Sequence, residues 1–193
     1  MRLKIVQVGE AVLRRRATEL TAAEIRSRET QDLIEWMRET MHDAPGVGLA
    51  APQIGLPLQL AVIEDKPENL KDATAEFLKE RERQPVPFQV IVNPKITLQG
   101  PANVEFFEGC LSLQGFTAVV PRARKVKVTH LDHNGESRVI EAAGWYARIL
   151  QHEIDHLHGT VYIDRMRPRT FMSVDNFNRY WKNTPMSEVL KLA

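Results

Sequence analysis

The sequence contains few of the features that mark specialised protein classes. It has one cysteine, Cys110, among 193 residues, so no disulfide can form within the chain. We therefore expect a reducing compartment, or a cysteine kept for its chemistry. Neither sign of charge is in excess, because 26 Lys and Arg stand against 25 Asp and Glu. No global charge indicates a nucleic-acid or anionic-membrane partner.

Long hydrophobic segments are also missing. The longest stretch without Asp, Glu, Lys or Arg, residues 44–63, contains three prolines and three glycines, which exclude a membrane-spanning helix. The first 20 residues lack the apolar core of a secretory signal, and their two acidic residues argue against a transit peptide. We expect a soluble protein, cytoplasmic as in bacteria, with an organellar origin left open.

The composition, 43% hydrophobic and 26% charged, is that of one globular domain over residues 1–193. Apolar periodicity predicts helices over 21–41, opened by a Thr21/Glu24 capping box, and over 143–157, ended by Gly159. Strands are predicted at 58–63, 88–92, 104–107, 118–120, 126–131 and 138–142, with Asn93-Pro94 and Asn134-Gly135 as turns. This order predicts an α+β fold of mostly antiparallel sheets around a central helix, the second one.

Two segments lie outside this plan. Residues 66–83 carry ten charges in 18 residues, which predicts a charged surface insertion, partly helical over 73–83. Residues 170–193 form a C-terminal extension, in which Thr184-Pro185 is expected to start a short helix with Met186, Val189 and Leu190 turned inward.

The strongest chemical signal is His152-Glu153-Ile154-Asp155-His156, an H-E-x-x-H motif on the second predicted helix. Two histidines four residues apart differ by about 40° around a helix and about 6 Å along it, so both can reach one metal ion. Glu153 lies beside them, free to hold a water. Trp145 and Ile149 mark this helix face as buried, where unpaired polar groups would cost several kcal/mol. The motif therefore predicts a metal site.

A catalytic metal site of this type needs a third protein ligand. The metzincin pattern requires a histidine where this chain has Tyr162, and the thermolysin-like pattern requires a downstream glutamate, for which only Glu188 is present. Upstream, Cys110 in Glu108-Gly109-Cys110-Leu111-Ser112 would complete a Cys-His-His site suited to Fe(II), Ni(II), Co(II) or Zn(II). A lone cysteine is more often a small buried hydrophobe, but the H-E-x-x-H motif favours the ligand.

A glycine-rich segment over residues 46–53 matches the dinucleotide-binding pattern G-x-G-x-x-A. That pattern needs a strand before it and a helix starting within it, whereas here a helix precedes it and Pro52 follows. We therefore expect an extended loop whose glycines let the backbone approach a ligand.

The three segments 46–53, 108–112 and 152–156, in this order and at this spacing, resemble the signature motifs of the peptide deformylase family. The likeness extends over about residues 5–170. It implies an enzyme that removes the N-formyl group from the initiator methionine of new polypeptides and releases formate. The partners it implies are N-formyl-methionyl nascent peptides, with a transient ribosome contact as an open question.

The resemblance also implies a role for each matching residue. One divalent ion, typically Fe(II) with zinc or nickel as substitutes, would be held by Cys110, His152 and His156. Glu153 would be the general acid/base, and the Gln53 side chain and Leu111 backbone N–H would stabilise the oxyanion. Substrate contacts would come from the backbone at Gly48 and Gly109 and from an apolar methionine pocket, for which the candidates are Val47, Trp145 and Ile149.

Two other hypotheses compete with this one. An H-E-x-x-H peptidase that cleaves internal bonds would not require Cys110. A non-catalytic metal-binding or ribosome-binding relative should have lost Glu153 or Gln53, and both are present here.

Overall fold

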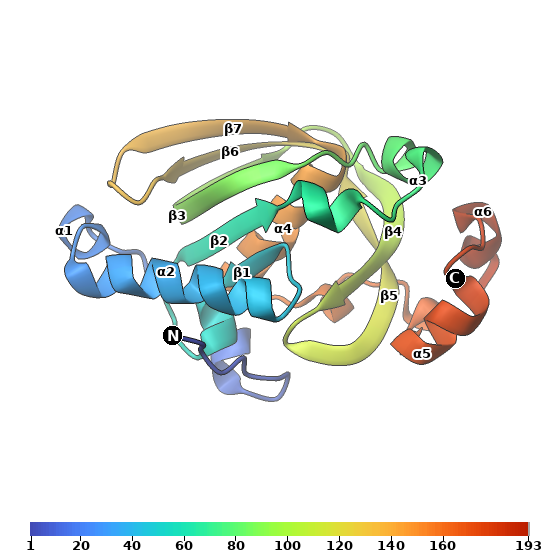
Figure 1. Cartoon of the computed structure of the whole chain (residues 1–193), viewed down its shortest axis with the longest axis horizontal. Helices are drawn as coiled ribbons and strands as arrows, with labels where there is room; N and C mark the ends of the chain where they lie inside the picture. Colours follow the sequence, from blue (N-terminus) through green and yellow to red (C-terminus); the bar gives the residue numbers. More distant parts are fainter. Residues whose placement is uncertain (193) are drawn as a thin grey trace.

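The computed structural model describes residues 1–192. Its strands are β1 (Gly48–Ala50), β2 (Leu60–Asp65), β3 (Val86–Leu98), β4 (Ala102–Cys110), β5 (Leu113–Ala123), β6 (Lys125–Leu131), β7 (Ser137–Ala143) and β8 (Met172–Ser173). Its α-helices are α1 (Ala22–Ile25), α2 (Arg28–Asp43), α3 (Ala75–Glu80), α4 (Gly144–Leu157), α5 (Val174–Asn176) and α6 (Met186–Val189) (Figure 1).

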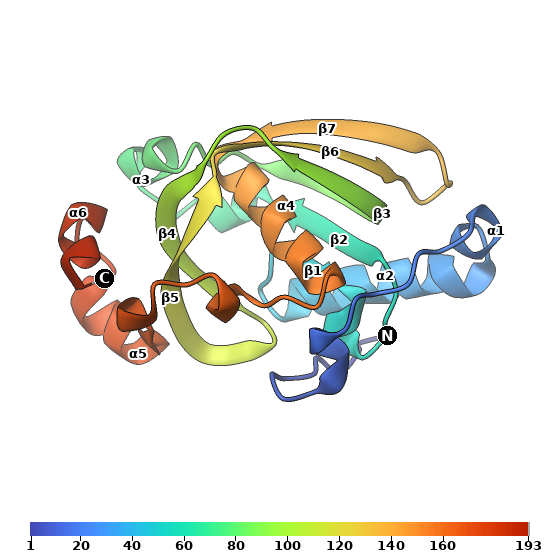
Figure 2. The ribbon, with the colours of Figure 1, turned by 180° about the vertical axis from the view of Figure 1, so that it is seen from behind.

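Five strands form an antiparallel sheet in the order β1-β2-β3-β6-β7. Helix α2 covers one face of this sheet and α4 the other (Figures 1 and 2). Strand β2 shows why both faces are buried. Leu60 and Val62 belong to the core cluster that includes α2, whereas Ala61 and Ile63 belong to the cluster that includes α4. Successive side chains of a strand point to opposite faces, so a continuous apolar run fits a sheet covered on both sides.

A second sheet has three strands in the order β4-β5-β8, again antiparallel. Figure 2 shows α4 in the angle between the two sheets. The predicted α+β fold, with antiparallel sheets around a central helix, is confirmed. Strands β1 and β4 are each at one edge of their sheet.

The predicted helix over 21–41 is two helices, and the prediction of one continuous helix is wrong. The capping box is correct, because Thr21 Oγ1 accepts from the Glu24 backbone N–H and Glu24 accepts from the Thr21 N–H. Helix α1 ends after one turn, and Ser27 caps α2 by accepting from the Thr30 N–H. Ser and Thr caps satisfy the free N–H groups of a first turn, so a second cap starts a second helix.

The six predicted strands are all present, in the predicted order, as β2 to β7, but the short strands β1 and β8 were not predicted and β3 is longer than expected. Asn93-Pro94, predicted as a turn, lies within β3, where Asn93 has a φ of 49° and the register with β6 shifts. The Asn93 side chain pairs instead with the Leu20 backbone, at 3.0 Å to its N and 2.8 Å to its O. Asn134-Gly135 forms the expected turn between β6 and β7, with Gly135 at φ 77°.

The charged segment 66–83 lies on the surface, and none of its residues is buried. Its end nevertheless packs onto the main body. The Arg83 guanidinium pairs with buried Asp65 at 2.8 Å and lies 5.3 Å from the Trp145 ring. In the C-terminal segment, Val189 is buried as predicted, whereas Met186 and Leu190 are half-buried.

Helix α4 begins at Gly144, where the chain needs a left-handed backbone and close contact. Gly144 has a φ of 58°, and a Cβ there would lie 2.8 Å from the Arg81 carbonyl oxygen. Gly55 also has a positive φ, 84°, but its Cβ would meet only Val6 at an ordinary 3.9 Å.

We predict that Gly144→Ala lowers the free energy of unfolding by about 3 kcal/mol, because backbone strain and steric overlap add. Gly55→Ala, with strain alone, should cost about 1 kcal/mol. Chemical denaturation of both variants measures the difference. Equal losses of stability in the two variants would mean that segment 66–83 moves aside and relieves the overlap with the new methyl group at position 144.

Candidate metal centre and substrate cavity

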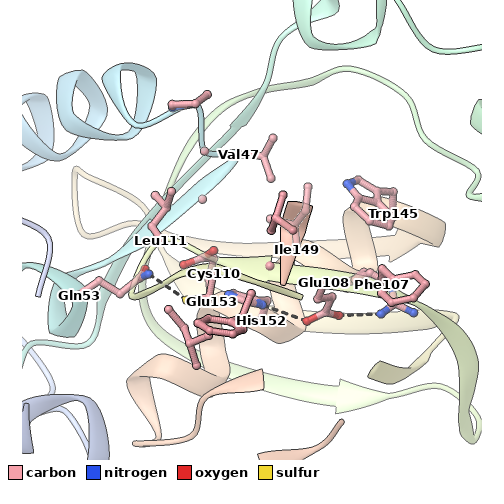
Figure 3. Close-up of a pocket in the computed structure, with 18 of the residues that line it drawn as sticks. Val47, Gln53, Phe107, Glu108, Cys110, Leu111, Trp145, Ile149, His152 and Glu153 are labelled. Atoms are coloured by element: carbon pink, nitrogen blue, oxygen red, sulfur yellow. Dashed lines mark hydrogen bonds and ion pairs between the residues drawn. The ribbon is translucent and has the colours of Figure 1, made fainter. Parts of the chain in front are cut away.

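Two segments distant in sequence meet at one point. The C-terminal end of β4 brings Cys110 to the face of α4 that carries His152 (Figure 3), and His156 is on the same helix one turn further on. One ligand atom from each of these three residues lies within 4.8 Å of the others, and the Cys110 Sγ to His156 Nε2 distance is 3.3 Å. The structure therefore brings together the three residues expected to bind the metal. A thiolate with two imidazoles is a donor set that fits a divalent transition metal.

Glu108 fixes the orientation of His152. Its Oε2 lies 3.0 Å from His152 Nδ1, which leaves Nε2 as the ring nitrogen free for a metal. Metal-binding histidines commonly hold their second nitrogen against a carboxylate in this way. His156 differs, because its buried Nδ1 has no hydrogen-bond partner among the described residues.

Glu108 is also the centre of a buried ionic network. Arg122 contacts both of its oxygens at 3.0 Å, and Arg148 reaches Oε1 at 2.6 Å. Arg122 also donates to Asp155 at 2.5 Å, and Arg165 pairs with the same carboxylate. Burial alone would raise the pKa of Glu108, but the Arg122 charge and the His152 hydrogen bond outweigh it and hold that pKa well below its usual range. Glu108 is therefore a permanent anion behind His152.

The pKa of Glu153 is shifted in the opposite direction from that of Glu108. Its side chain is buried, and its Oε2 has no partner among the described residues. Burial raises the pKa of Glu153 to about 7. The β1 backbone approaches it so closely that a Cβ on Gly48 would overlap the Glu153 carboxylate. Gly48 thus makes room for the acid, which stays free to exchange a proton near neutral pH.

Gln53 is positioned by its own short helical turn, Ala51–Ile54. The Ala50 N–H donates to Gln53 Oε1 at 2.8 Å, so the amide NH₂ faces Cys110 Sγ at 3.5 Å. Leu111 follows Cys110 in the turn between β4 and β5, and its side chain lies against Gly46. Gln53 and Leu111 therefore both lie beside Cys110 (Figure 3).

A cavity of about 350 Å³ opens above these groups. All the residues named from the sequence line it except His156, which lies beneath with no exposed surface: Val47, Gly48, Gln53, Gly109, Cys110, Leu111, Trp145, Ile149, His152 and Glu153. Val47, Trp145 and Ile149 form an apolar wall on the α4 side of the cavity (Figure 3).

Sequence reasoning missed several lining residues: Glu108, Arg148, Phe107, Phe116, Leu113 and Val174. Arg148 had a usable signal, since it precedes His152 by one helical turn and an arginine on a buried face must have acidic partners. Val174 had none, because it comes from the C-terminal segment and reaches the cavity only through the pairing of β8 with β5.

A Cys-His-His cluster, a buried carboxylate of raised pKa and a cavity between two sheet edges are together the features expected of a metal-dependent hydrolase site. Comparisons with known proteins narrow this class. The family model described as polypeptide deformylase matches residues 2–171. The chain belongs to the polypeptide deformylase family.

Individual relatives of the chain also carry the name peptide deformylase. The chain is 49% identical to the chloroplastic peptide deformylase 1A of Solanum lycopersicum, over 90% of this chain and 63% of the relative. It is 40% identical to the mitochondrial peptide deformylase of Homo sapiens, over 92% and 71% of the two chains. The chain thus spans less than two thirds of the tomato protein's length. A Met-Ala-Ser-bound class I type b peptide deformylase from Acinetobacter baumannii superposes with a TM-score of 0.75 at 33% identity, covering 86% of this chain and 99% of that one.

The network behind His152 can be tested by neutralising its central charge. We predict that Glu108→Gln leaves Arg122 and Arg148 undercompensated and lowers the free energy of unfolding by about 3 kcal/mol or more. It should also weaken Zn(II) retention by about 10-fold to 100-fold, because His152 loses its carboxylate partner. Competition with a chelator measures the second effect. Glu105→Gln is the control, since Glu105 is on the same strand but pairs with exposed Arg167. Wild-type zinc retention in Glu108→Gln would show that Glu108 does not orient the ligand.

The raised pKa of Glu153 predicts a pH dependence of stability in the metal-free protein. The unfolded chain releases this proton near pH 4.5, whereas the folded protein keeps it until about pH 7. Folding therefore favours the protonated form, and stability falls as pH rises between these values. We expect wild type to lose about 2 kcal/mol more than Glu153→Gln between pH 5 and pH 8, measured by denaturant titration of chelator-treated protein. If the stability of wild type and of Glu153→Gln changed equally with pH, the raised pKa of Glu153 would be contradicted.

Proposed function

We propose that this protein hydrolyses the N-formyl group from the N-terminal methionine of newly synthesised polypeptides and releases formate. One observation carries the proposal most strongly. Three candidate ligand atoms, from Cys110, His152 and His156, lie within 4.8 Å of one another beside the unpaired carboxylate of Glu153. Family membership supports the same activity.

The metal we propose is Fe(II), held by Cys110, His152 and His156. A soft thiolate with two imidazoles also accepts Zn(II), Ni(II) or Co(II), and the resemblance to the family favours iron. When bound, the ion acidifies water and polarises the formyl oxygen.

Glu153 is the proposed general acid/base. A carboxyl group with a pKa of about 7 can accept a proton from the attacking water and donate it later near neutral pH. The proton goes to the amine nitrogen of methionine as the bond to the formyl carbon breaks.

Gln53 and Leu111 are the proposed oxyanion donors. Attack on the formyl carbon places negative charge on its oxygen, for which the Gln53 NH₂ group, 3.5 Å from Cys110 Sγ, and the backbone N–H of the next residue, Leu111, are the proposed donors. Donors aimed at such a charge contribute about 3 kcal/mol each. The hydrogen bond from the Ala50 N–H holds the Gln53 amide in the donating orientation.

The substrate backbone would extend between two sheet edges. Gly48 is in β1 and Gly109 in β4, both edge strands that border the cavity. An extended peptide can pair with such edges through main-chain hydrogen bonds, which are indifferent to its sequence. The methionine side chain would then enter the apolar wall of Val47, Trp145 and Ile149. No observation favours the internal-bond peptidase, which would need no cysteine.

The setting we infer is a reducing compartment in which nascent chains carry formyl-methionine: the bacterial cytoplasm, or the matrix or stroma of an organelle. Relatives from chloroplasts, mitochondria and bacteria support this range. Among residues 1–192, no helix has the length and apolar character needed to cross a membrane. Because the substrate emerges from the ribosome, we also propose a transient ribosome contact.

The deciding experiment is formate release from formyl-Met-Ala-Ser by protein purified without oxygen and loaded with Fe(II) or Ni(II). We predict turnover in wild type and a loss of at least about 100-fold in Glu153→Ala, which removes the proton carrier but no metal ligand. Metal content of the variant, measured by elemental analysis, should stay at the wild-type level.

Two further variants complete the design. Cys110→Ala should lose metal, which separates this site from a peptidase site that needs only the H-E-x-x-H motif. Glu141→Gln, on the exposed strand β7, is the matched control for changing a carboxylate and should keep full activity. Absence of formate from fully metallated wild type would reject the proposed function.

A further inference from the structure

The C-terminal segment lies against the cavity rather than apart from it. Strand β8 pairs with β5 through Thr117↔Met172 and Phe116↔Ser173. Helix α5 and the π-helical turn Phe177–Trp181 follow directly, beside β5 on the right of Figure 1. Val174, the first residue of α5, lines the same cavity as the candidate metal ligands.

Two aromatic pairs hold this segment against the cavity wall. Phe171 stacks on Phe116 with ring centroids 5.0 Å apart and planes 9° from parallel. Phe177 packs on Phe107 at 4.7 Å and 55°. Phe107 and Phe116 both line the cavity. The segment thus supplies one lining residue and supports two others.

Successive side chains of β4 point to two different sides of the cavity. Phe106 and Glu108 face α4, since Phe106 lies 6.4 Å from the Trp145 ring and Glu108 contacts His152. Phe107, between them, faces the opposite side, where Phe177 covers it. Adjacent strands share their pleat, so a peptide paired with β4 would alternate between these two sides.

Large apolar side chains are exposed on the side away from α4. Phe116 is 43%, Phe171 40% and Val174 36% exposed. Clustered apolar exposure at the mouth of a cavity indicates a surface that a ligand covers. The patch is continuous with the metal cavity, so the ligand that covers it is a later part of the same bound chain.

We propose that residues 171–177 form a subsite, with Phe107 and Phe116, for an apolar side chain at the position immediately after the formyl-methionine. This inference rests on the proposed deformylase function. If the methionine side chain enters the pocket on the α4 side, the next side chain points to the Phe107 side. The C-terminal segment is then a specificity element for the second residue of the substrate.

The test compares formyl-Met-X-Ser peptides in which X is Ala, Leu or Phe, using the full metal-loaded chain. Wild type should prefer Leu and Phe over Ala by about fivefold in kcat/KM, through KM rather than kcat. Phe177→Ala should reduce this preference to less than about twofold. Tyr180→Ala is the control, because Tyr180 is on the same turn, is 62% exposed and does not line the cavity. It should keep the wild-type preference.

A charge exchange at Val174 makes the test independent of stability. Val174→Asp should favour X = Lys over X = Asp, and Val174→Lys should favour X = Asp, with the two variants differing by about tenfold at low salt and converging at high salt. No divergence between them, or an unchanged Leu and Phe preference in Phe177→Ala, would overturn the subsite. Wild type that releases formate equally from every peptide would overturn the subsite and leave the proposed function standing. Release from none would reject the function itself.

Discussion

The buried charge of Glu108 is the constraint on which the site depends. It joins β4 to β5 through Arg122 and β4 to α4 through Arg148 and His152, so one carboxylate connects the second sheet to the central helix. A buried anion is costly unless its partners surround it, and here three cationic or polar donors do so. The contacts that join the second sheet to α4 also fix the orientation of the His152 ring. The contacts of Glu108 that join the second sheet to α4 are therefore the same contacts that orient His152, a proposed metal ligand.

Two carboxylates that line the cavity lie in contrasting environments. Glu108, on β4, is held as an anion by the Arg122 charge and the His152 hydrogen bond, whereas burial raises the pKa of Glu153, on α4, to about 7. The two carboxylates thus differ in how readily they hold a proton because their surroundings differ, and under the proposed function one is structural and the other chemical. The close approach of Gly48 places the Glu153 carboxylate against the β1 backbone, in space that a side chain at position 48 would occupy.

Local patterns in the sequence were enough to predict most of the fold and the centre of the site. The H-E-x-x-H spacing placed His152 and His156 on one face of α4, and apolar periodicity predicted the strands in order. Features set by tertiary partners were not predictable. The second cap at Ser27 and the irregularity at Asn93 depend on side chains that compete with local propensity. Val174 lines the cavity because β8 pairs with β5, and no local sequence pattern predicts that pairing.

The two open strand edges at Gly48 and Gly109 have a consequence for the timing of the reaction. Under the proposed function, the recess between them would bind a single extended chain, and a finished sheet or helix cannot present its first residue in that form. A substrate would then have to be captured before its own N-terminus is incorporated into a folded domain. Under the proposed function, the protein competes with the folding of its substrates, and a chain whose first strand pairs early would keep its formyl group.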